Sequence, residues 1–436
     1  MKTLFRTALL LVCGFPLFAC TPHAASDAPY RIEEGTIVFA EPARAEGQCD
    51  VLQLRCDPIP VVRVAFIGLG MRGSTAVERF TQLDGVEIVA LCDKVPAHVE
   101  RAQRTLSVHG LPAAQEFTGA DDWRRVCELE GVDLIYNCTD WQMHVPIALY
   151  AMERGKHVVT ANKALIAAYY TELTALAAKQ GVALRCTAAV GGGIPWLVNL
   201  ARVKRLDTVG AVGGIMNGTT NFIMDAMHKA DVDFPAILKE AQALGYAEAD
   251  PSADIDGDDI RRKLCISANI AFDAVLDETA IPTFGIRTVT AEDIAAFQAH
   301  GFVCKLLATA QAAEDGVCAF VEPTLVDKSE PEAAVPANYN LIGYTAEKVG
   351  KQTFFGQGAG RFPTASNVMQ DCLTVLAGEK GFYTAKAAPD ALCAAAAHPY
   401  YVRTAVPDAF LRSRVADDWG TGVVTGAVDV YEMLAW

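Results

Sequence analysis

The sequence predicts an α/β protein in which a domain built on a parallel β-sheet precedes an α+β domain. Its 436 residues, of which 52% are hydrophobic, are enough for two or three domains with large cores. Apolar strand-like runs alternate with helix-compatible segments over residues 61–160. Far downstream, residues 244–263 form a carboxylate-rich loop that leads into an amphipathic helix. The first half therefore predicts a ligand-binding sheet, and the second predicts a site with charged side chains.

The net charge and the cysteines limit the partners and the compartment. A charge of −15 without basic runs disfavours nucleic acid and anionic membrane surfaces as partners. The thirteen cysteines are an odd number, and no pair has the spacing of zinc ligands. Most lie in apolar or strand-like runs, which is typical of buried thiols in a reducing compartment. Examples are Cys92, Cys138, Cys186, Cys265 and Cys304.

The amino terminus indicates a different compartment. Two basic residues precede an apolar run over residues 8–19 that ends at Cys20, the layout of an export signal with a lipoprotein-type cysteine. The run is too short to span a bilayer. We expect a signal-like leader over residues 1–25 and a linker rich in Pro, Ala and acids over residues 26–60.

A glycine-rich turn follows the first predicted strand, residues 61–67. The order strand, G-x-G-x-x-G, helix to Leu83, strand and acid is typical of a Rossmann-type dinucleotide-binding domain. Gly68 allows the tight turn, Gly70 lets the backbone approach a pyrophosphate, and Gly73 lets helix and strand pack closely. We therefore expect these glycines to bind the phosphates of NAD or NADP at the helix amino terminus.

The second predicted strand, residues 86–91, leads to Asp93. An acid about 20 residues after the glycines bonds the ribose 2′-hydroxyl and repels a 2′-phosphate. Asp93 thus favours NAD, although Arg72 and Lys94 leave NADP open. A parallel sheet that binds no dinucleotide is the simpler alternative.

Two further strands are predicted over residues 133–139 and 157–160. Ligands of an open parallel sheet lie at the carboxyl ends of its strands, so we expect the residues that follow them near the nicotinamide. These residues are Thr139, Asp140, Asn162 and Lys163. Lys163 is a candidate cation beside the reacting centre, and an ordinary surface lysine is the alternative.

The loop over residues 244–263 contains six carboxylates and is interrupted by Gly245 and Pro251. From Asp256 the pattern changes to that of a helix, on which Asp259 and Lys263 are four residues apart and share a face. A solvated helix start, with acids before bases, would give the same pattern.

Several motifs, in order along the chain, resemble homoserine dehydrogenases: VVTANKAL, TAAVGGGIPWL, GIMNGTTNFIM, LGYAEADPSADIDGDDIRRK and GQGAGRFPTASNVMQD. The earlier segments GLGMRGSTAVERF and NCTDWQMHVPIALYAMERGKHV also resemble the glucose-fructose oxidoreductase-like family, particularly its NAD-dependent glycosidase branch. The homoserine dehydrogenase resemblance covers residues 158–375, and residues 61–157 fit either family. The expected domains are dinucleotide-binding (61–186), catalytic and dimerisation (187–355), a return segment to the nucleotide domain (356–375) and a C-terminal extension (376–436).

The resemblance implies reversible reduction of L-aspartate 4-semialdehyde to L-homoserine by reduced NAD or NADP, in a homodimer. It implies Lys263 as the general acid, Asp259 as its partner and Glu248 as the ligand of the substrate ammonium. Hydride addition to an aldehyde builds negative charge on oxygen, which a positioned ammonium can stabilise and protonate. The resemblance adds Tyr246, Thr219, Asp254 and Lys163 at the substrate. It adds Thr139, Lys163, Gly245 and Gly360 at the cofactor.

The family also has a monovalent-cation site, made of backbone carbonyls in the TAAVGGGIP segment and a Glu. Thr187 stands at the position of that Glu. The carbonyls of Val190, Gly192 and Ile194 remain to coordinate a sodium-like ion, and the sequence leaves open whether they do. In residues 376–436, too few residues follow the Tyr-Tyr-Val-Arg run for a complete regulatory domain.

Two other functions remain open at this point. An exported sugar oxidoreductase or glycosidase would fit the leader and would make His144 a site residue. A non-catalytic lipoprotein whose domain binds a metabolite is the third possibility. The proposed chemistry places the protein in the cytoplasm, whereas a genuine leader ending at Cys20 would place it outside.

Overall fold

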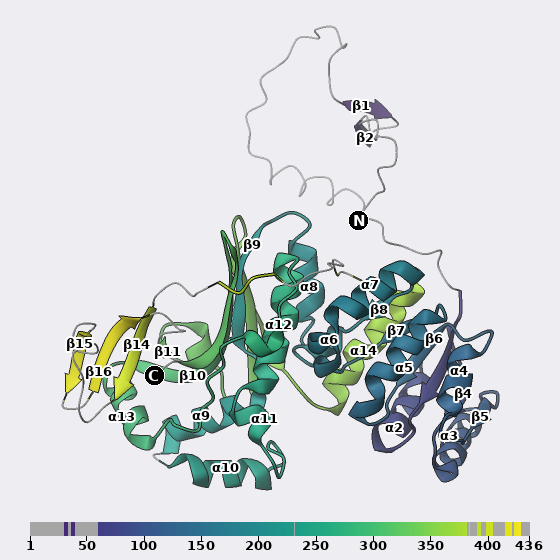
Figure 1. Cartoon of the computed structure of the whole chain (residues 1–436), viewed down its shortest axis with the longest axis horizontal. Coiled ribbons are helices and arrows are strands. Elements are labelled where there is room, and N and C mark those ends of the chain that lie inside the picture. Colours follow the sequence, from purple (N-terminus) through teal and green to yellow (C-terminus); the bar gives the residue numbers. More distant parts are fainter. Residues whose placement is uncertain are drawn as a thin grey trace, which may run out of the picture. The chain divides into compact units, whose positions relative to one another are not determined.

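The structure, a computed structural model, divides into two units, Met1–Gln53 and Leu54–Trp436 (Figure 1). It describes residues 30–33, 36–39, 60–230, 232–381, 383, 390–393, 398–403, 415–420 and 423–428. In the first unit, β1 (Tyr30–Glu33) and β2 (Thr36–Phe39) pair as antiparallel strands, which the sequence did not predict within the expected linker. The expected leader, residues 1–25, lies outside the described residues.

The second unit begins with a six-stranded parallel sheet in the order β5-β4-β3-β6-β7-β8. Its strands are β3 (Val62–Ile67), β4 (Val86–Cys92), β5 (Gln115–Phe117), β6 (Leu134–Asn137), β7 (His157–Val159) and β8 (Leu184–Arg185). The order reverses between β3 and β6, and open α/β sheets bind their ligands at such a point. The predicted Rossmann-type sheet is confirmed.

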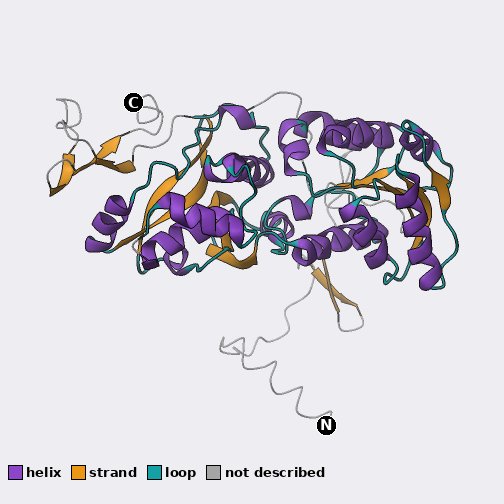
Figure 2. Ribbon diagram, turned by 90° about the horizontal axis from the view of Figure 1, so that it is seen from below, coloured by secondary structure: helices purple, strands orange, loops and turns teal. Residues whose placement is uncertain are grey.

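Helices cover both faces of this sheet (Figure 2). They are α2 (Met71–Phe80), α3 (Pro96–Val108), α4 (Asp122–Glu128), α5 (Trp141–Glu153), α6 (Lys163–Ala168) and α7 (Tyr170–Gln180). The first of them ends at Phe80 rather than at the predicted Leu83, because the chain turns toward β4 through Gly85, whose φ is +75°.

One face of the parallel sheet is completed by α14 (Arg361–Leu376), from far along the chain. Apolar side chains of α14, β3 and α2 share one buried cluster. It includes Val62, Val64, Phe66, Ala76, Val77, Phe80, Val368, Cys372 and Val375. The segment predicted to return to this domain, residues 356–375, contains all but the last residue of this helix.

The following part of the chain forms an antiparallel sheet in the order β11-β10-β9-β12-β13. Its strands are β9 (Val209–Ile215), β10 (Phe302–Ala313), β11 (Gly316–Asp327), β12 (Tyr339–Ala346) and β13 (Gly350–Gln357). Its helices are α8 (Trp196–Val203), α9 (Gly218–Ala230), α10 (Phe234–Ala243), α11 (Ser252–Ile255), α12 (Asp258–Phe272) and α13 (Ala291–Ala299), with 3-10 turns η2 (Thr187–Ala189), η3 (Glu278–Ala280) and η4 (Pro331–Ala334). The predicted α+β class of this half is confirmed.

Helix α12 connects the two halves of this unit. It follows Gly257, whose φ is +91°, so the helix predicted from Asp256 begins at Asp258. The helix contacts β9, β10 and β11 as well as α6 of the parallel-sheet half. Most of its residues are buried, including the charged Asp259 and Lys263. A charged pair is therefore held at the contact between the two halves.

The last described strands form a small antiparallel sheet in the order β14-β16-β15. They are β14 (His398–Arg403), β15 (Val415–Gly420) and β16 (Val423–Val428). Tyr401 donates a hydrogen bond to Asp293 of α13 (2.8 Å), and Arg403 donates one to Glu292 (3.0 Å), which hold β14 against that helix. Among the described residues, no helix combines the length and apolar character needed to cross a membrane.

Most of the cysteines singled out from the sequence are buried, as expected. Cys92, Cys186, Cys265 and Cys304 are buried free thiols, and Cys138 is partly buried. Burial raises the pKa of the Cys92, Cys265 and Cys304 thiols to about 12. These side chains act as small apolar groups in the core.

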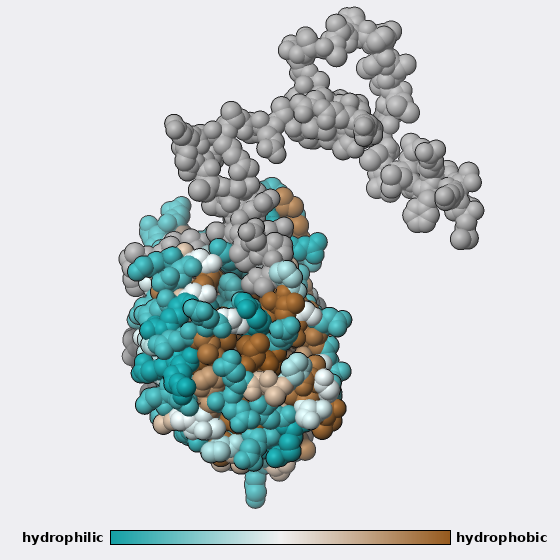
Figure 3. All heavy atoms as spheres, turned by 90° about the vertical axis from the view of Figure 1, so that its right-hand side faces the viewer, coloured by the Kyte–Doolittle hydropathy of each residue, from teal (hydrophilic) through white to brown (hydrophobic). Residues whose placement is uncertain are grey.

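The surface of the parallel-sheet half is mostly hydrophilic, with apolar side chains gathered toward the middle of the face in Figure 3. Exposed apolar residues of this half include Met71, Val95, Val108 and Leu111. Exposure of individual apolar side chains is ordinary for a folded protein.

The core of the antiparallel half contains a fully buried lysine. Lys305 of β10 donates hydrogen bonds to Asn221 Oδ1 (3.0 Å) and to the Val335 carbonyl (2.8 Å), and within the described residues it has no carboxylate partner. Burial lowers the pKa of Lys305 to about 8.

This lysine predicts a rise in stability at alkaline pH. Between about pH 8 and 10.5 the unfolded chain keeps the Lys305 proton while the folded protein loses it, so the free energy of unfolding should rise by roughly 3 kcal/mol over that range. Urea unfolding of the wild type and Lys305→Met at several pH values isolates this effect. Parallel pH dependences in the two proteins would contradict it.

Candidate functional site

Two turns meet where the order of the parallel strands reverses. Gly68, with φ of +87°, follows β3, and a Cβ placed on it would lie 2.6 Å from the backbone nitrogen of Thr139, which follows β6. A Cβ on Gly73 would overlap the Gly68 carbonyl oxygen, whereas one on Gly70 would meet open space. Gly68 and Gly73 are thus required for packing. Gly70 leaves the backbone accessible, which fits the predicted phosphate site.

The amino terminus of α2 and the side chain of Asp93 complete this turn. The N-cap of α2 is Gly70, and no side chain caps the helix, so its first amides are available to an anion. The two oxygens of Asp93 accept hydrogen bonds from the amides of Leu69 (2.6 Å) and Val95 (2.8 Å). Asp93 therefore braces the glycine turn, a role that the sequence did not reveal. Its contact with the cofactor ribose stays a prediction.

A cluster of three charged side chains joins the two halves. Asp259 Oδ1 is 2.8 Å from Nζ of Lys163, and Asp259 Oδ2 is 2.7 Å from Nζ of Lys263. Lys163 begins α6, directly after β7, whereas the other two lie one turn apart on α12. The Lys163 side chain is 37% exposed, and those of Asp259 and Lys263 are 8% exposed. The structure thus brings three predicted site residues into direct contact, and it rules out the solvated helix start.

The cluster keeps Asp259 ionised. Burial alone would raise its pKa, but the positive charges of Lys263 and Lys163 lower the pKa of Asp259 well below its usual range. Asn217 donates hydrogen bonds to both Asp259 (2.8 Å) and Asp254 (2.7 Å). Burial, and then the charge of Asp259, raise the pKa of Asp254. At neutral pH Asp259 is therefore the anion that balances the two ammonium groups.

Two hydrogen bonds hold Lys263, and a third holds the serine that bonds its carbonyl. Its ammonium donates to the Met216 carbonyl (2.6 Å), and its own carbonyl accepts from Ser267 Oγ (2.8 Å). Nε1 of Trp196 in turn donates to Ser267 Oγ at 2.9 Å. The ammonium itself is held between the Met216 carbonyl and Asp259, which positions it in advance for a substrate.

A chain of hydrogen bonds through His144 sets the position of Lys163. Asn162 caps α6 by accepting from the Leu165 amide (3.1 Å), and its Nδ2 donates to His144 Nδ1 (2.8 Å). His144 Nε2 then donates to the Thr139 carbonyl (3.0 Å), which assigns the ring proton to Nε2. These hydrogen bonds link the turn after β6 to the turn after β7. The sequence suggested His144 only for the sugar oxidoreductase alternative, because its partners lie on two different turns.

The predicted substrate residues are only partly brought together. Thr219 Oγ1 donates to the Tyr246 carbonyl (2.6 Å), and Asp254 reaches the charged cluster through Asn217. Glu248 lies exposed on the loop before α11, and among the described residues its carboxylate forms no hydrogen bond or ion pair with the cluster. Gly245, a predicted cofactor residue with φ of +76°, turns the same loop. A carboxylate without a protein partner is available to a ligand.

Two family models match the chain. The model described as "Homoserine dehydrogenase, NAD binding domain" matches residues 68–187, and the model described as "Homoserine dehydrogenase" matches residues 195–373. A homoserine dehydrogenase of Corynebacterium glutamicum is 37% identical over 324 residues, which cover 72% of each chain. The chain belongs to the homoserine dehydrogenase family.

The chain is also similar to other members of the homoserine dehydrogenase family. The Synechocystis enzyme is 43% identical over 234 residues, and the match spans only about half (54%) of its length. The crystal structure of a homoserine dehydrogenase from Thiobacillus denitrificans has a TM-score of 0.69 at 29% identity, covering 84% of this chain and 90% of that chain. Both family models are those of homoserine dehydrogenase. The sugar oxidoreductase or glycosidase alternative gains no support.

At the turn where the homoserine dehydrogenase resemblance places a monovalent cation, two predicted ligands already have protein partners. Nδ2 of Asn367, on α14, donates to the carbonyls of Gly192 (2.6 Å) and Ile194 (3.1 Å). Val190 is fully buried at the start of the turn, and Gly360, with φ of +120°, is the N-cap of α14. The sequence did not indicate a role for Asn367, because its two hydrogen-bond partners lie more than a hundred residues away along the chain.

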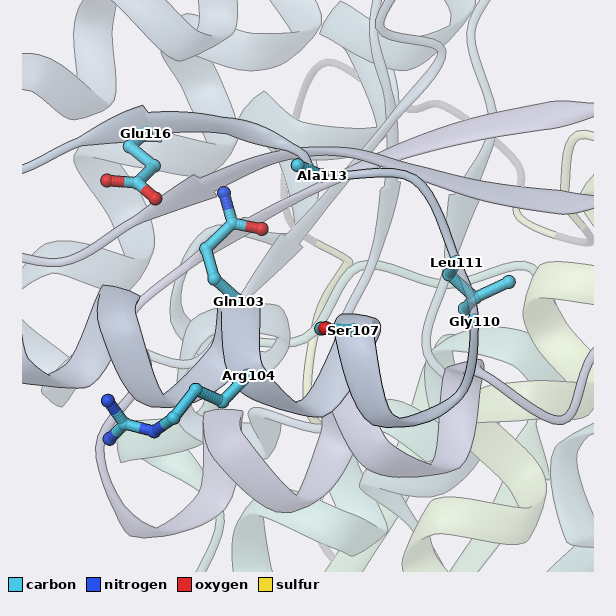
Figure 4. Close-up of a pocket in the computed structure, with 7 residues that line it drawn as sticks. All are labelled: Gln103, Arg104, Ser107, Gly110, Leu111, Ala113 and Glu116. Atoms are coloured by element: carbon cyan, nitrogen blue, oxygen red, sulfur yellow. The ribbon is translucent and has the colours of Figure 1, made fainter.

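A hollow of about 570 Å³ lies on the parallel-sheet half (Figure 4). It is bounded by α3, by the loop that follows this helix and by β5. The residues that line it are Gln103, Arg104, Ser107, Gly110, Leu111, Ala113 and Glu116. None of the predicted site residues lines it. The hollow is therefore separate from the candidate active site.

Proposed function

We propose that the chain catalyses the reversible, nicotinamide-dependent interconversion of L-aspartate 4-semialdehyde and L-homoserine. Membership of the homoserine dehydrogenase family supports this reaction. The observation that carries it here is the Lys163–Asp259–Lys263 cluster, which places a buried ammonium beside the carboxyl end of the parallel sheet.

Three features of the glycine turn fit a bound dinucleotide. They are the accessible backbone at Gly70, the uncapped start of α2 and the hydrogen bonds of Asp93 to the turn. When bound, the nicotinamide would supply or accept a hydride. We propose that the turn holds its phosphates and that Thr139, Lys163, Gly245 and Gly360 lie around the rest of the cofactor. Asp93 would favour NAD through the ribose, and comparing kcat/KM for the two reduced cofactors measures that preference.

Lys263 would act as the general acid. Reduction of the aldehyde adds a hydride to carbon and a proton to oxygen, and the oxygen gains negative charge before it is protonated. A buried ammonium stabilises that charge strongly because little water screens it. Lys263 then gives its proton to the oxygen to form the alcohol, and in the reverse direction it takes the hydroxyl proton. Asp259 keeps the ammonium oriented, and Lys163 adds positive charge on the cofactor side.

The assay that tests this reaction follows nicotinamide absorbance with purified full-length protein. Aspartate semialdehyde should drive oxidation of the reduced cofactor, and homoserine should drive the reverse. Sugars, sugar alcohols and glycosides serve as negative controls. Turnover of those compounds without turnover of the semialdehyde would overturn the proposal.

Glu248 would bind the substrate ammonium, together with Tyr246, Thr219 and Asp254. For Glu248→Gln we expect KM for homoserine to rise about tenfold to a hundredfold, the effect of losing one charge-assisted hydrogen bond, with kcat changed only a few-fold. The matched control is Glu240→Gln, an exposed carboxylate on α10. An unchanged KM for Glu248→Gln would remove it from the pocket.

We also propose a homodimer in a reducing compartment, the cytoplasm. The dimer rests on the family resemblance, and the location rests on the buried free thiols and on the cytoplasmic supply of reduced nicotinamide. Light scattering after size exclusion tests the dimer. Sequencing the amino terminus of the native protein tests the location, because a mature protein that starts at Cys20 would indicate export.

A further inference from the structure

The family resemblance implies that an ion binds the carbonyls of the turn over residues 190–194. In this chain the side chain of Asn367 binds two of those carbonyls. Asn367 is buried, and its Nδ2 contacts the carbonyl oxygens of Gly192 (2.6 Å) and Ile194 (3.1 Å). The Ile194 carbonyl also accepts from the Trp196 amide at 2.7 Å. A carbonyl oxygen has two lone pairs, so the acceptor capacity of Ile194 is already used.

The chemistry of these partners decides how the Asn367 amide is oriented. Both partners are carbonyl oxygens, which only accept hydrogen bonds, so the NH₂ end of the amide must face them. The opposite orientation would bring three oxygens together without a proton between them. Direct contact at 2.6 Å with Gly192 leaves no space for an ion between the two groups.

The charge at this turn does not favour a cation either. Thr187 is neutral, and its amide and hydroxyl donate to the two oxygens of Asp371 at 2.8 and 2.6 Å. Arg185 also contacts Asp371, with its Nε 3.3 Å from Oδ1. All three side chains are buried. The nearby carboxylate is thus neutralised by a guanidinium and is directed at Thr187.

The backbone of the turn is also closely packed on the return segment. A Cβ on Gly192 would lie 2.6 Å from the Gly358 carbonyl carbon, and one on Gly193 would lie 2.7 Å from Cβ of Pro363. The Gly193 amide donates to the Gln357 carbonyl at 3.2 Å. Protein atoms fill the space around these glycines.

We propose that Asn367 replaces the monovalent cation: its amide holds the glycine turn on α14, and the enzyme works without activation by sodium or potassium. The turn leads directly into α8, where Trp196 bonds Ser267 and Ser267 bonds the Lys263 carbonyl. Asn367 is therefore a positioning residue that acts on Lys263 through the turn. The part of this inference that concerns activity rests on the proposed dehydrogenase reaction.

The test compares sodium, potassium and choline chloride at equal ionic strength, because choline is too large for such a site. Wild-type kcat/KM and Tm should agree within about twofold and one degree in the three salts, since a ligand that does not bind the folded state does not stabilise it. For Asn367→Asp, which cannot donate, we expect a loss of about tenfold to a hundredfold in choline. Sodium or potassium should restore activity and raise Tm, because the new carboxylate and the two carbonyls supply oxygen ligands.

The matched control is Gln370→Glu, the same chemical change at an exposed position of α14, which should respond to no cation. If Asn367→Asp does not fold, Asn367→Ser removes the amide while leaving the carbonyls open and should gain the same cation response. Full activity of either variant in choline would overturn the inference.

Cation activation of the wild type would also overturn it. In that case we would look for the residue that binds the cation at Asn340, which packs against Gly358. The buried side-chain amide of Asn340 has no hydrogen-bond partner among the described residues. Absence of any wild-type turnover would instead count against the proposed reaction. The Tm measurements would still test the role of Asn367, because they do not depend on substrate.

Discussion

Replacing Lys263 by alanine is expected to lower kcat by about 10²-fold to 10⁴-fold, the usual contribution of a positioned general acid. The loss should appear in kcat in both directions, with a smaller change in KM, because the ammonium acts on charge that develops only during hydride transfer. Steady-state rates with aspartate semialdehyde and with homoserine measure the effect. A near-normal kcat would remove Lys263 from the mechanism.

The matched control for this variant is Lys229→Ala. Lys229 is also paired with a carboxylate four residues away, Asp225, at 2.8 Å, but its side chain is 64% exposed on α9. Such a surface pair contributes little to stability. Equal losses in the two variants would mean that the Lys263 effect is not specific to the buried cluster.

Replacing Asp259 by asparagine is expected to destabilise the fold by about 3–5 kcal/mol, the cost of leaving buried charges without their partner. Both ammonium groups lose their carboxylate at once, and Lys263 is nearly excluded from water. Activity should fall as well, because Lys263 loses its orientation. Urea unfolding at neutral pH measures the stability change.

Two further measurements separate charge from packing at Asp259. The pKa of Asp259 is lowered in the folded protein, so its stabilising effect is present above about pH 4 and is lost as pH falls toward the folded value. The stability difference between wild type and Asp259→Asn should therefore shrink in acid. The double variant Asp259→Asn/Lys263→Met removes the unpaired ammonium and should recover stability without recovering activity. A double variant as unstable as the single one would contradict this account.

Local sequence patterns predicted the four strands next to the glycine turn, but not the short edge strands β5 and β8 or the packing of α14. Gly68, Gly70 and Gly73 follow a continuous apolar strand, and the structure places that strand at the centre of the sheet. The pairing of Asp259 with Lys263 was also predictable, because residues four apart on a helix share a face. Patterns of this kind involve neighbours in the chain, where spacing alone decides the geometry.

Contacts between distant segments could not be predicted in the same way. The ion pair of Asp259 with Lys163 joins α12 to α6, and the hydrogen bonds of Asn367 join α14 to the glycine turn. No local periodicity encodes such contacts, since they depend on how complete elements pack. The bracing of the glycine turn by Asp93 was missed for a different reason: the motif assigns the acid to the ribose, and its contacts with protein amides have no separate signature.

The position of α14 constrains the order in which the protein can fold during synthesis. The parallel sheet is encoded before residue 186, yet Val368, Cys372 and Val375 form part of its core. A nascent chain that has released only the sheet would expose Val62, Phe66 and their neighbours to water until the ribosome has moved almost two hundred residues further. The parallel-sheet half therefore completes its core only after the antiparallel half has been synthesised, and premature termination between them should yield an aggregation-prone product.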